Sequence, residues 1–207
     1  VTAANANVTG GTLNVPGRVV VTQTLQLGGG SVLLPGTMTA ADATITGGSL
    51  NVPGRFDIAQ ALQMGGGSLS VPGTMTAASA SITGGTLNVG GSFGVAQTVQ
   101  LGGGSVIVNG QLTAPEVNIF GAGLLGGSGL IAANVLNGGI VSPGNSPGTM
   151  TINGNYTQTS SGTLAMEVGV GAYDRLVVNG AASLAGALAV STVGGGTLAF
   201  GDTYQFL

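Results

Sequence analysis

The sequence contains no cysteine, histidine, lysine or tryptophan, and only 4% of its 207 residues are charged. An ordinary globular domain carries about 25% charged residues. Without cysteine and histidine, the chain lacks the usual nucleophile and base pairs of hydrolases and the ligands that most often hold zinc. These absences predict a protein that is not an enzyme and binds no metal or other cofactor.

The few charged side chains are spread along the chain and leave a net charge of −3. Nucleic-acid binding needs a basic footprint, and anionic membrane surfaces attract clusters of lysine or arginine. We therefore expect no nucleic-acid partner and no attachment to such surfaces. The cations are Arg18, Arg55 and Arg175, and the anions are Asp42, Asp57, Glu116, Glu167, Asp174 and Asp202.

Long hydrophobic runs are also missing, although 43% of the residues are hydrophobic. Polar residues and glycine interrupt every apolar run well before the ~18–20 residues that a transmembrane helix needs. Membrane barrels need strands of ~9–11 residues and aromatic girdles, whereas the runs here are short and aromatic residues make up 4% of the chain. We expect no membrane insertion. The 42 glycines follow no strict three-residue period, which excludes collagen.

The main positive signal is an internal repeat. Residues 3–39, 40–76 and 77–113 align without insertion at a period of 37 residues. Each copy contains the motif Gly-Gly-(Ser/Thr)-apolar-x-apolar-(Pro/Gly/Asn)-Gly twice, so the underlying unit has 18–19 residues. Such a period indicates a solenoid in which each unit stacks on its neighbours. The motif starts at Gly10, Gly29, Gly47, Gly66, Gly84 and Gly103.

Within each unit the apolar residues alternate with polar ones, which is typical of short β-strands. Gly-Gly and Pro-Gly pairs separate the strands and favour sharp corners. Three short strands and three corners account for 18–19 residues, which is one coil of a parallel β-helix. Helical repeats are excluded because glycine and proline recur too often. A propeller with blades of ~40–45 residues remains the alternative.

In a β-helix each residue lies about 4.8 Å above its counterpart one coil earlier. The motif therefore predicts two inward columns of aliphatic side chains. We also expect Phe56 and Phe93 to point inward. The first column holds Leu13, Val32, Leu50, Leu69, Leu87 and Val106, and the second holds Val15, Leu34, Val52, Val71, Val89 and Val108.

The chain divides into a regular solenoid over residues 1–113 and a less regular continuation over residues 114–207. Strand-like alternation continues at 150–152, 164–168, 176–178, 188–190 and 198–200, and we expect a last strand at 203–207. Without a visible linker, the sequence predicts one continuous body of ten or eleven coils, roughly 50 Å long.

Residues 138–207 resemble the C-terminal part of autotransporter passenger domains and the exported repeat proteins that carry a PEP-CTERM sorting tail. The resemblance rests on the run from Gly139 to Ile152, which reads GIVSPGNSPGTMTI, and on the segments GNYTQ, DRLVVNG and GDTYQFL that follow it. The 37-residue copies are similar, more loosely, to filamentous-haemagglutinin repeats. These resemblances imply a right-handed parallel β-helix, secretion to the bacterial surface, and adhesive or structural work.

Two carboxylate pairs are the catalytic candidates that the sequence offers, because a glycosidase needs two nearby carboxyl groups. Asp42 and Asp57 are 15 residues apart, less than one coil, so we expect them on different faces. Glu167 and Asp174 are closer, but we expect a surface residue and a solvated turn there. No catalytic, cofactor-binding or metal-binding residue is therefore assigned.

Other motifs receive structural interpretations. The glycine triplets at 28–30, 65–67 and 102–104 lack the Lys-Ser/Thr of a phosphate loop and are expected to be corners. Arg55 and Asp57 are expected to pair, and Arg18 occupies the same phase one period earlier, where the third copy has Ser92. Sequons at Asn7 and Asn155 are interpreted as chance matches.

The sequence thus favours a secreted, non-enzymatic structural protein, a subunit of a surface filament or a rigid stalk. The chain begins at Val1 inside a repeat and is interpreted as a piece of a longer product. Its end coils carry no polar lid, so end-to-end self-association near Val1 and Leu207 is expected. The alternative is an adhesin that binds glycans or host proteins along the solenoid flank. An ice-binding array is disfavoured because its threonines, such as Thr37 and Thr39, recur only every second coil.

Overall fold

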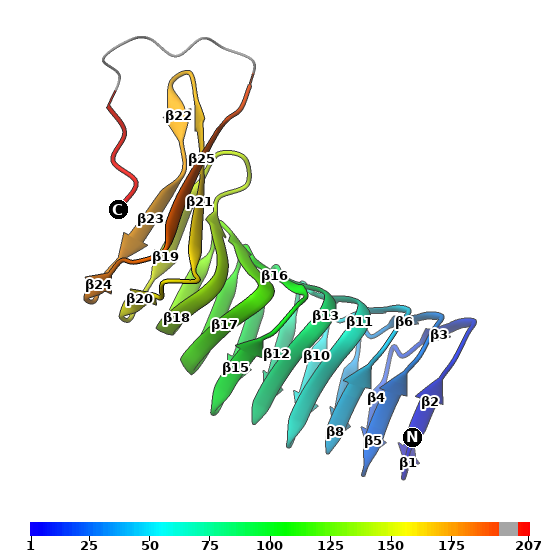
Figure 1. The fold of residues 1–207 in the computed structure, drawn as a ribbon. Coiled ribbons are helices and arrows are strands. Elements are labelled where there is room, and N and C mark those ends of the chain that lie inside the picture. Colours follow the sequence, from blue (N-terminus) through cyan, green and yellow to red (C-terminus); the bar gives the residue numbers. More distant parts are fainter. Residues whose placement is uncertain (195–202) are drawn as a thin grey trace.

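The computed structural model describes residues 1–194 and 203–207. Within these residues the chain forms β-strands joined by turns and no helix, and it winds into a parallel β-solenoid of about nine turns. Figure 1 shows the turns stacked side by side from the blue N-terminal end to the orange C-terminal end. The predicted fold class and the coil of about 19 residues are therefore confirmed.

Three faces make up each turn, one for each of the three strands that the sequence predicts. The first face holds β1 (Thr2–Ala3), β4 (Arg18–Val21), β7 (Thr37–Ala40), β10 (Arg55–Ile58), β12 (Thr74–Ala77), β14 (Ser92–Val95), β19 (Thr149–Ile152) and β23 (Arg175–Val178). The second holds β2 (Ala6–Val8), β5 (Thr24–Leu27), β8 (Asp42–Ile45), β15 (Thr98–Leu101), β20 (Tyr156–Gln158) and β24 (Ala182–Ser183). The third holds β3 (Thr12–Asn14), β6 (Ser31–Leu33), β9 (Ser49–Asn51), β16 (Ser105–Val108), β21 (Thr163–Gly169) and β25 (Ala187–Thr192).

Four longer strands bend around corners and join the faces. The strands β11 (Ala61–Val71) and β13 (Ser79–Val89) serve the second and third faces, while β17 (Gln111–Gly127) and β18 (Leu130–Pro143) contribute to all three. One short strand, β22 (Ala172–Tyr173), pairs antiparallel with β21 and forms a hairpin that projects from the stack in Figure 1.

The strand register produces the predicted inward columns. Leu13 pairs with Val32, Val32 with Leu50, and the series continues through Leu125, Val141 and Leu164 to Leu188. Every member between the two ends is buried, whereas Leu13 is 38% and Leu188 is 55% exposed. The second predicted column, from Val15 to Val108, is buried throughout. Phe56 and Phe93 are also buried, as expected.

Side-chain size explains why the sequence repeats every two coils. On the second face a column alternates small and large residues, because Ala6, Leu25, Ala43, Leu62 and Ala80 lie on one another in turn. On the first face methionine and phenylalanine alternate at Met38, Phe56, Met75 and Phe93, so two residue types of different shape again repeat every two coils. Close packing of the bore requires such complementary volumes. A large side chain in one coil therefore faces a small one in the next.

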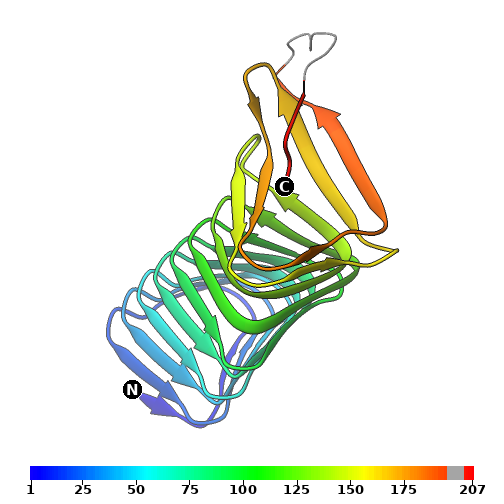
Figure 2. The ribbon, with the colours of Figure 1, turned by 90° about the vertical axis from the view of Figure 1, so that its left-hand side faces the viewer.

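The count of ten or eleven coils is wrong because the later turns are longer. Ile131 pairs with Ile152 and Val141 with Leu164, so this turn takes 21–23 residues instead of 18–19. Thr149 pairs with Arg175, so the next turn takes 26. The β21–β22 hairpin absorbs some of the additional residues. Figure 2, which looks along the stack, shows the larger outline of the last turns.

The last strand expected from the sequence, at 203–207, is not found. Residues 203–207 are described and form no strand, although the Leu176 N–H donates to the Phe206 carbonyl at 2.8 Å. The strand expected at 198–200 lies outside the described residues.

Corner glycines make the close stacking of coils possible, which yields a first prediction. Gly17 and Gly54 both stand between proline and arginine. A Cβ atom at Gly54 would overlap the backbone carbonyl of Gly36 in the coil below, whereas a Cβ at Gly17, in the first coil, would meet nothing within 4 Å. We expect Gly54→Ala to lower the free energy of unfolding by about 2 kcal/mol or more, and Gly17→Ala to change it little.

Urea unfolding followed by circular dichroism measures both variants against the unsubstituted chain. Equal effects of the two substitutions would show that the glycines matter for chain flexibility and not for contact between coils.

Candidate functional site

The carboxylates of the regular half lie apart. Asp42 stands on β8 of the second face and Asp57 on β10 of the first face, which confirms that they do not form a pair. The Asp42 carboxylate accepts a hydrogen bond from the Ala61 N–H at 3.1 Å. Asp57 accepts from Arg55 Nε at 2.7 Å and from Thr76 Oγ1 at 2.9 Å. Both carboxylates therefore have partners within the solenoid.

The expected Arg55–Asp57 ion pair is confirmed, and it shifts the pKa of both groups. Burial by itself would raise the pKa of Asp57, but the hydrogen bonds from Arg55 and Thr76 and the arginine charge outweigh it, so this pKa lies below its ordinary value. The pair is exposed at the arginine end, where water screens the attraction. Thr37 separates Arg18 from Arg55 in the stack, so no continuous charged ladder forms.

Glu167 lies half-buried on the strand β21, whereas Asp174 differs from the prediction. Asp174 is fully buried and does not belong to a solvated turn. One of its carboxylate oxygens accepts from the Gly148 N–H at 2.8 Å and the other from the Glu167 N–H at 2.7 Å. Burial raises the pKa of Asp174, and the two backbone hydrogen bonds act in the opposite direction. The Asp174 carboxylate thus joins the β18–β19 connection to the β21–β22 hairpin.

A polar cluster inside the bore is the largest feature that the sequence reasoning missed. The inward column of Leu101 and Ile119 continues with Asn137 and Gln158, both of which are buried. Tyr156, also fully buried, lies between them and completes the cluster. The alternation that places Tyr156 in phase with Val135 also places Gln158 inward, and this pattern could have revealed the cluster.

Hydrogen bonds connect the cluster to three successive turns. Asn137 Nδ2 donates to the Tyr156 hydroxyl and to the Thr163 carbonyl at 3.0 Å each. The Tyr156 hydroxyl donates to Gln158 Oε1 at 2.8 Å. Gln158 Nε2 then donates to backbone carbonyls of the last turn, including that of Ala187 at 2.9 Å. Buried polar groups that are satisfied in this way specify one arrangement of the backbone.

The N-terminal end of the bore is open. A hollow of about 390 Å³ is lined mainly by apolar side chains, among them Val1, Ala6, Leu13 and Val19. Val1 stands in the phase of Val19 and Met38, because Thr2 pairs with Val20. The first turn therefore presents both an apolar surface and one edge of each of its strands.

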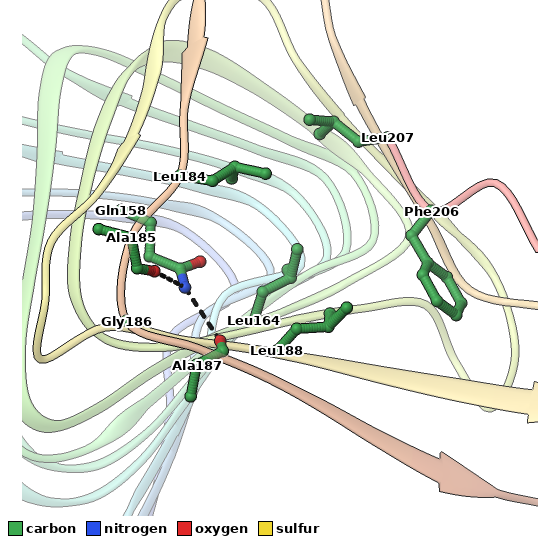
Figure 3. A pocket seen from close by; sticks show the side chains of 9 residues that line it. All are labelled: Gln158, Leu164, Leu184, Ala185, Gly186, Ala187, Leu188, Phe206 and Leu207. Atoms are coloured by element: carbon green, nitrogen blue, oxygen red, sulfur yellow. Dashed lines mark hydrogen bonds between the residues drawn. The ribbon is translucent and has the colours of Figure 1, made fainter.

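The C-terminal end has a smaller hollow of about 250 Å³. Figure 3 shows Leu184 and Leu188 on one side of it, Phe206 and Leu207 on the other, and the Gln158 amide at its base. Leu184 and Leu188 are more than half exposed. Phe206 packs against the core and lies 6.4 Å from the stacked ring of Tyr204, measured between ring centroids. The C-terminal residues cover part of this end.

The remaining motifs have structural positions. The triplets at 28–30, 65–67 and 102–104 lie between the second and third faces, and Gly30 and Gly67 have φ angles of 73° and 70°, so these triplets are corners. Among the residues that the structure describes, no group of three or more metal-ligating side chains comes together. The same residues contain no helix that could cross a membrane.

Comparisons of this chain with protein-family models, with curated proteins and with solved structures give no match.

The buried cluster predicts a specific alkaline response. Burial raises the pKa of Tyr156 to about 12, against about 10 for an exposed tyrosine. Between these values the unfolded chain loses the phenol proton while the folded chain keeps it, so stability falls as the pH rises from about 10 to about 12, by up to about 3 kcal/mol.

The test compares the unsubstituted chain with Tyr156→Phe. The variant should be less stable by about 1–3 kcal/mol near neutral pH, because Asn137 and Gln158 lose a partner. Its deficit should shrink as the pH rises through this window, as measured by urea unfolding at each pH. A deficit that stays constant between pH 9 and 12 would contradict the assignment.

A further prediction concerns Asp174. Asp174→Ala leaves the Gly148 and Glu167 N–H groups without an acceptor, so we expect a loss of about 1–3 kcal/mol in stability. Asp174→Asn keeps one acceptor oxygen, so its stability should lie between that of the unsubstituted chain and that of Asp174→Ala. Hydrogen exchange should become faster at the Gly148 and Glu167 amides in particular. Glu116→Ala, which removes a carboxylate elsewhere, serves as the control and should leave both amides protected.

Proposed function

We propose that this chain is a non-enzymatic structural rod on the outside of a bacterial cell, part of a surface filament or a stiff stalk. The observation that carries the proposal is the unbroken stack, in which one apolar column runs from Leu13 to Leu188 and is buried between these two ends. Each turn contacts only its neighbours, so length can be added without changing the cross-section.

The positions of the few ionisable side chains support a structural role and not a catalytic one. The carboxylates of Asp42, Asp57 and Asp174 are each engaged by a backbone N–H or a neighbouring side chain. A general acid or base has to reach a substrate in a cleft. Asp174 is fully buried, and its carboxylate is bound to backbone N–H groups of the same chain.

The resemblance to exported solenoids supports the location. The run from Gly139 to Ile152 forms the end of β18, the following turn and β19, within the stack that continues the regular repeats. In autotransporter passengers and PEP-CTERM proteins this pattern accompanies secretion, so we propose that the chain is secreted and displayed at the cell surface.

We further propose that a second copy of the chain stacks head to tail on the first. Val1, Ala6 and Leu13 begin three bore columns, and Val178, Ala182 and Leu188 end the same columns. At the N-terminal end, successive column members are five and seven residues apart along the chain. At the C-terminal end, they are four and six residues apart. The additional residues of the last turn lie largely in the projecting hairpin. The strands of the first and the last turn are therefore similarly spaced where two copies would pair.

Open strand edges favour such pairing, because their N–H and C=O groups form a template for another chain. A head-to-tail interface is heterologous and produces open filaments. The segment of residues 203–207 covers part of the C-terminal end, so the incoming copy has to pack beside Phe206.

Sedimentation across a wide concentration range tests this proposal. The unsubstituted chain should show a mass that grows with concentration, and electron micrographs should show rods longer than one chain. Leu13→Glu and Leu188→Glu place a charge at the N-terminal and the C-terminal end, respectively, and each should prevent growth. Leu33→Glu is the matched control, because Leu33 is 37% exposed on the outer side of β6.

Mixing the two end variants makes the orientation testable. Leu13→Glu keeps an intact C-terminal end and Leu188→Glu an intact N-terminal end, so a head-to-tail contact predicts dimers in the mixture only. A chain that remains monomeric at the highest concentration would overturn the assembly proposal. Equal inhibition by Leu33→Glu would point instead to lateral contacts.

A further inference from the structure

A groove on the outer flank stands apart from the polar surface around it. It has a volume of about 430 Å³ and lies where the second face turns toward the third. Its floor and walls come from three successive turns, β17, β18 and the segment after β20. The lining residues are Asn118, Ile119, Phe120, Gly121, Leu136, Gly138, Thr159 and Ser161.

Phe120 forms one wall of the groove because its neighbours in the stack are glycines. Phe120 pairs with Gly138 in the next turn, and its ring lies against Gly102 of the preceding turn, where a Cβ atom would approach the ring to 2.7 Å. Phe120 is 47% exposed. Gly138 carries no side chain that could cover the ring, and Phe120 lines the groove.

The opposite side of the groove carries hydroxyl groups. Thr159 Oγ1 and Ser161 Oγ lie 3.0 Å apart, and Ser161 Oγ donates to the Gly138 carbonyl at 3.2 Å. A Cβ atom at Gly138 would come within 3.2 Å of Thr159 Oγ1 and 3.3 Å of Ser161 Oγ. Both hydroxyls therefore lie close against Gly138 at the side of the groove.

Asn118 contributes an amide side chain to the lining of the groove. The Oδ1 atom of Asn118 is buried and has no hydrogen-bond partner among the described residues. A buried polar atom of this kind costs about 1–3 kcal/mol, so such atoms are rare in folded proteins. The Asn118 side chain lines the groove, but its Oδ1 atom is shielded from it, so a ligand there would meet the exposed part of the amide.

The lining contains no charged residue. None of the eight residues that form the groove is ionisable. A phosphate, a sulfate or an acidic sugar would find no cation to balance its charge. The combination of an aromatic ring, an apolar wall at Leu136, two hydroxyls and an amide suits a ligand with C–H groups on one side and hydroxyls on the other. The negative face of an aromatic ring attracts such C–H groups.

We infer that this groove binds a neutral saccharide of one or two rings, stacked on Phe120 and hydrogen-bonded to Asn118, Thr159 and Ser161. The volume lies within the range of about 300–1,000 Å³ that is usual for small-molecule sites. The site goes beyond the proposed structural role, because it would let a rod also attach to a carbohydrate surface.

The experiment uses four neutral disaccharides as probes: cellobiose, maltose, lactose and N,N′-diacetylchitobiose. Each is titrated into isotopically labelled protein, and amide shifts are followed by NMR. At least one probe should shift the amides of Gly121 and Gly138 with a saturable curve. Glucuronic acid, which is acidic, should bind more weakly than the best neutral probe.

Matched variants locate the binding. Phe120→Ala and Asn118→Leu should each weaken binding of the best probe about tenfold or more, which corresponds to about 1.4 kcal/mol. Gln63→Ala is the control, because Gln63 occupies the same outward column as Asn118 three turns earlier. It should leave the affinity unchanged.

Three results would overturn the inference. The first is that no neutral probe shifts these amides. The second is that Phe120→Ala binds as well as the unsubstituted chain. The third is that an apolar peptide fills the groove while the saccharides do not, which would assign it to protein docking. Repeating the titration with the Leu13→Glu variant separates this outcome from filament assembly, because saccharide binding requires only one copy.

Discussion

The stacking of each turn on the turn before it is the constraint on which the molecule depends. Strands pair in parallel with counterparts about 19 residues away, so a residue that enters the bore in one turn must fit the residue directly beneath it. Hydrogen bonds between turns fix the spacing, and the side-chain columns then decide which residues are tolerated. Glycine at the corners, aliphatic residues inside and a scarcity of charge all follow from this one geometry.

The regular half of the fold could be predicted from sequence because the repeat itself encodes the register. The spacing from Gly10 to Gly29 to Gly47 is enough to place Leu13 on Val32 and Val32 on Leu50. The later turns lack this internal check. The hairpin between β21 and β22 lengthens the last turn, and no sequence motif marks this hairpin. The sequence therefore predicts more turns than the structure has.

The polar features of the second half were harder to predict for a different reason. Alternation shows that Tyr156 and Gln158 point inward, but only the packed structure shows that Asn137 lies within hydrogen-bonding distance of Tyr156. Asp174 looks like a turn residue because it precedes Arg175, yet its partners, Gly148 and Glu167, come from other strands and connections. The groove beside Phe120 depends equally on neighbours one turn away. Long-range contacts of this kind leave no local signature in a single sequence.

The alternation of alanine and leucine in the second-face column has a consequence for how such a chain can change in length. A gain or loss of 37 residues keeps Ala43 between two leucines and adds or removes two rungs without disturbing any packed neighbour. A gain of a single coil would set leucine on leucine or alanine on alanine, with crowding in one case and a void in the other. Viable length variants of this rod should therefore differ by whole pairs of coils, because only such changes preserve the alternation of small and large side chains in the bore.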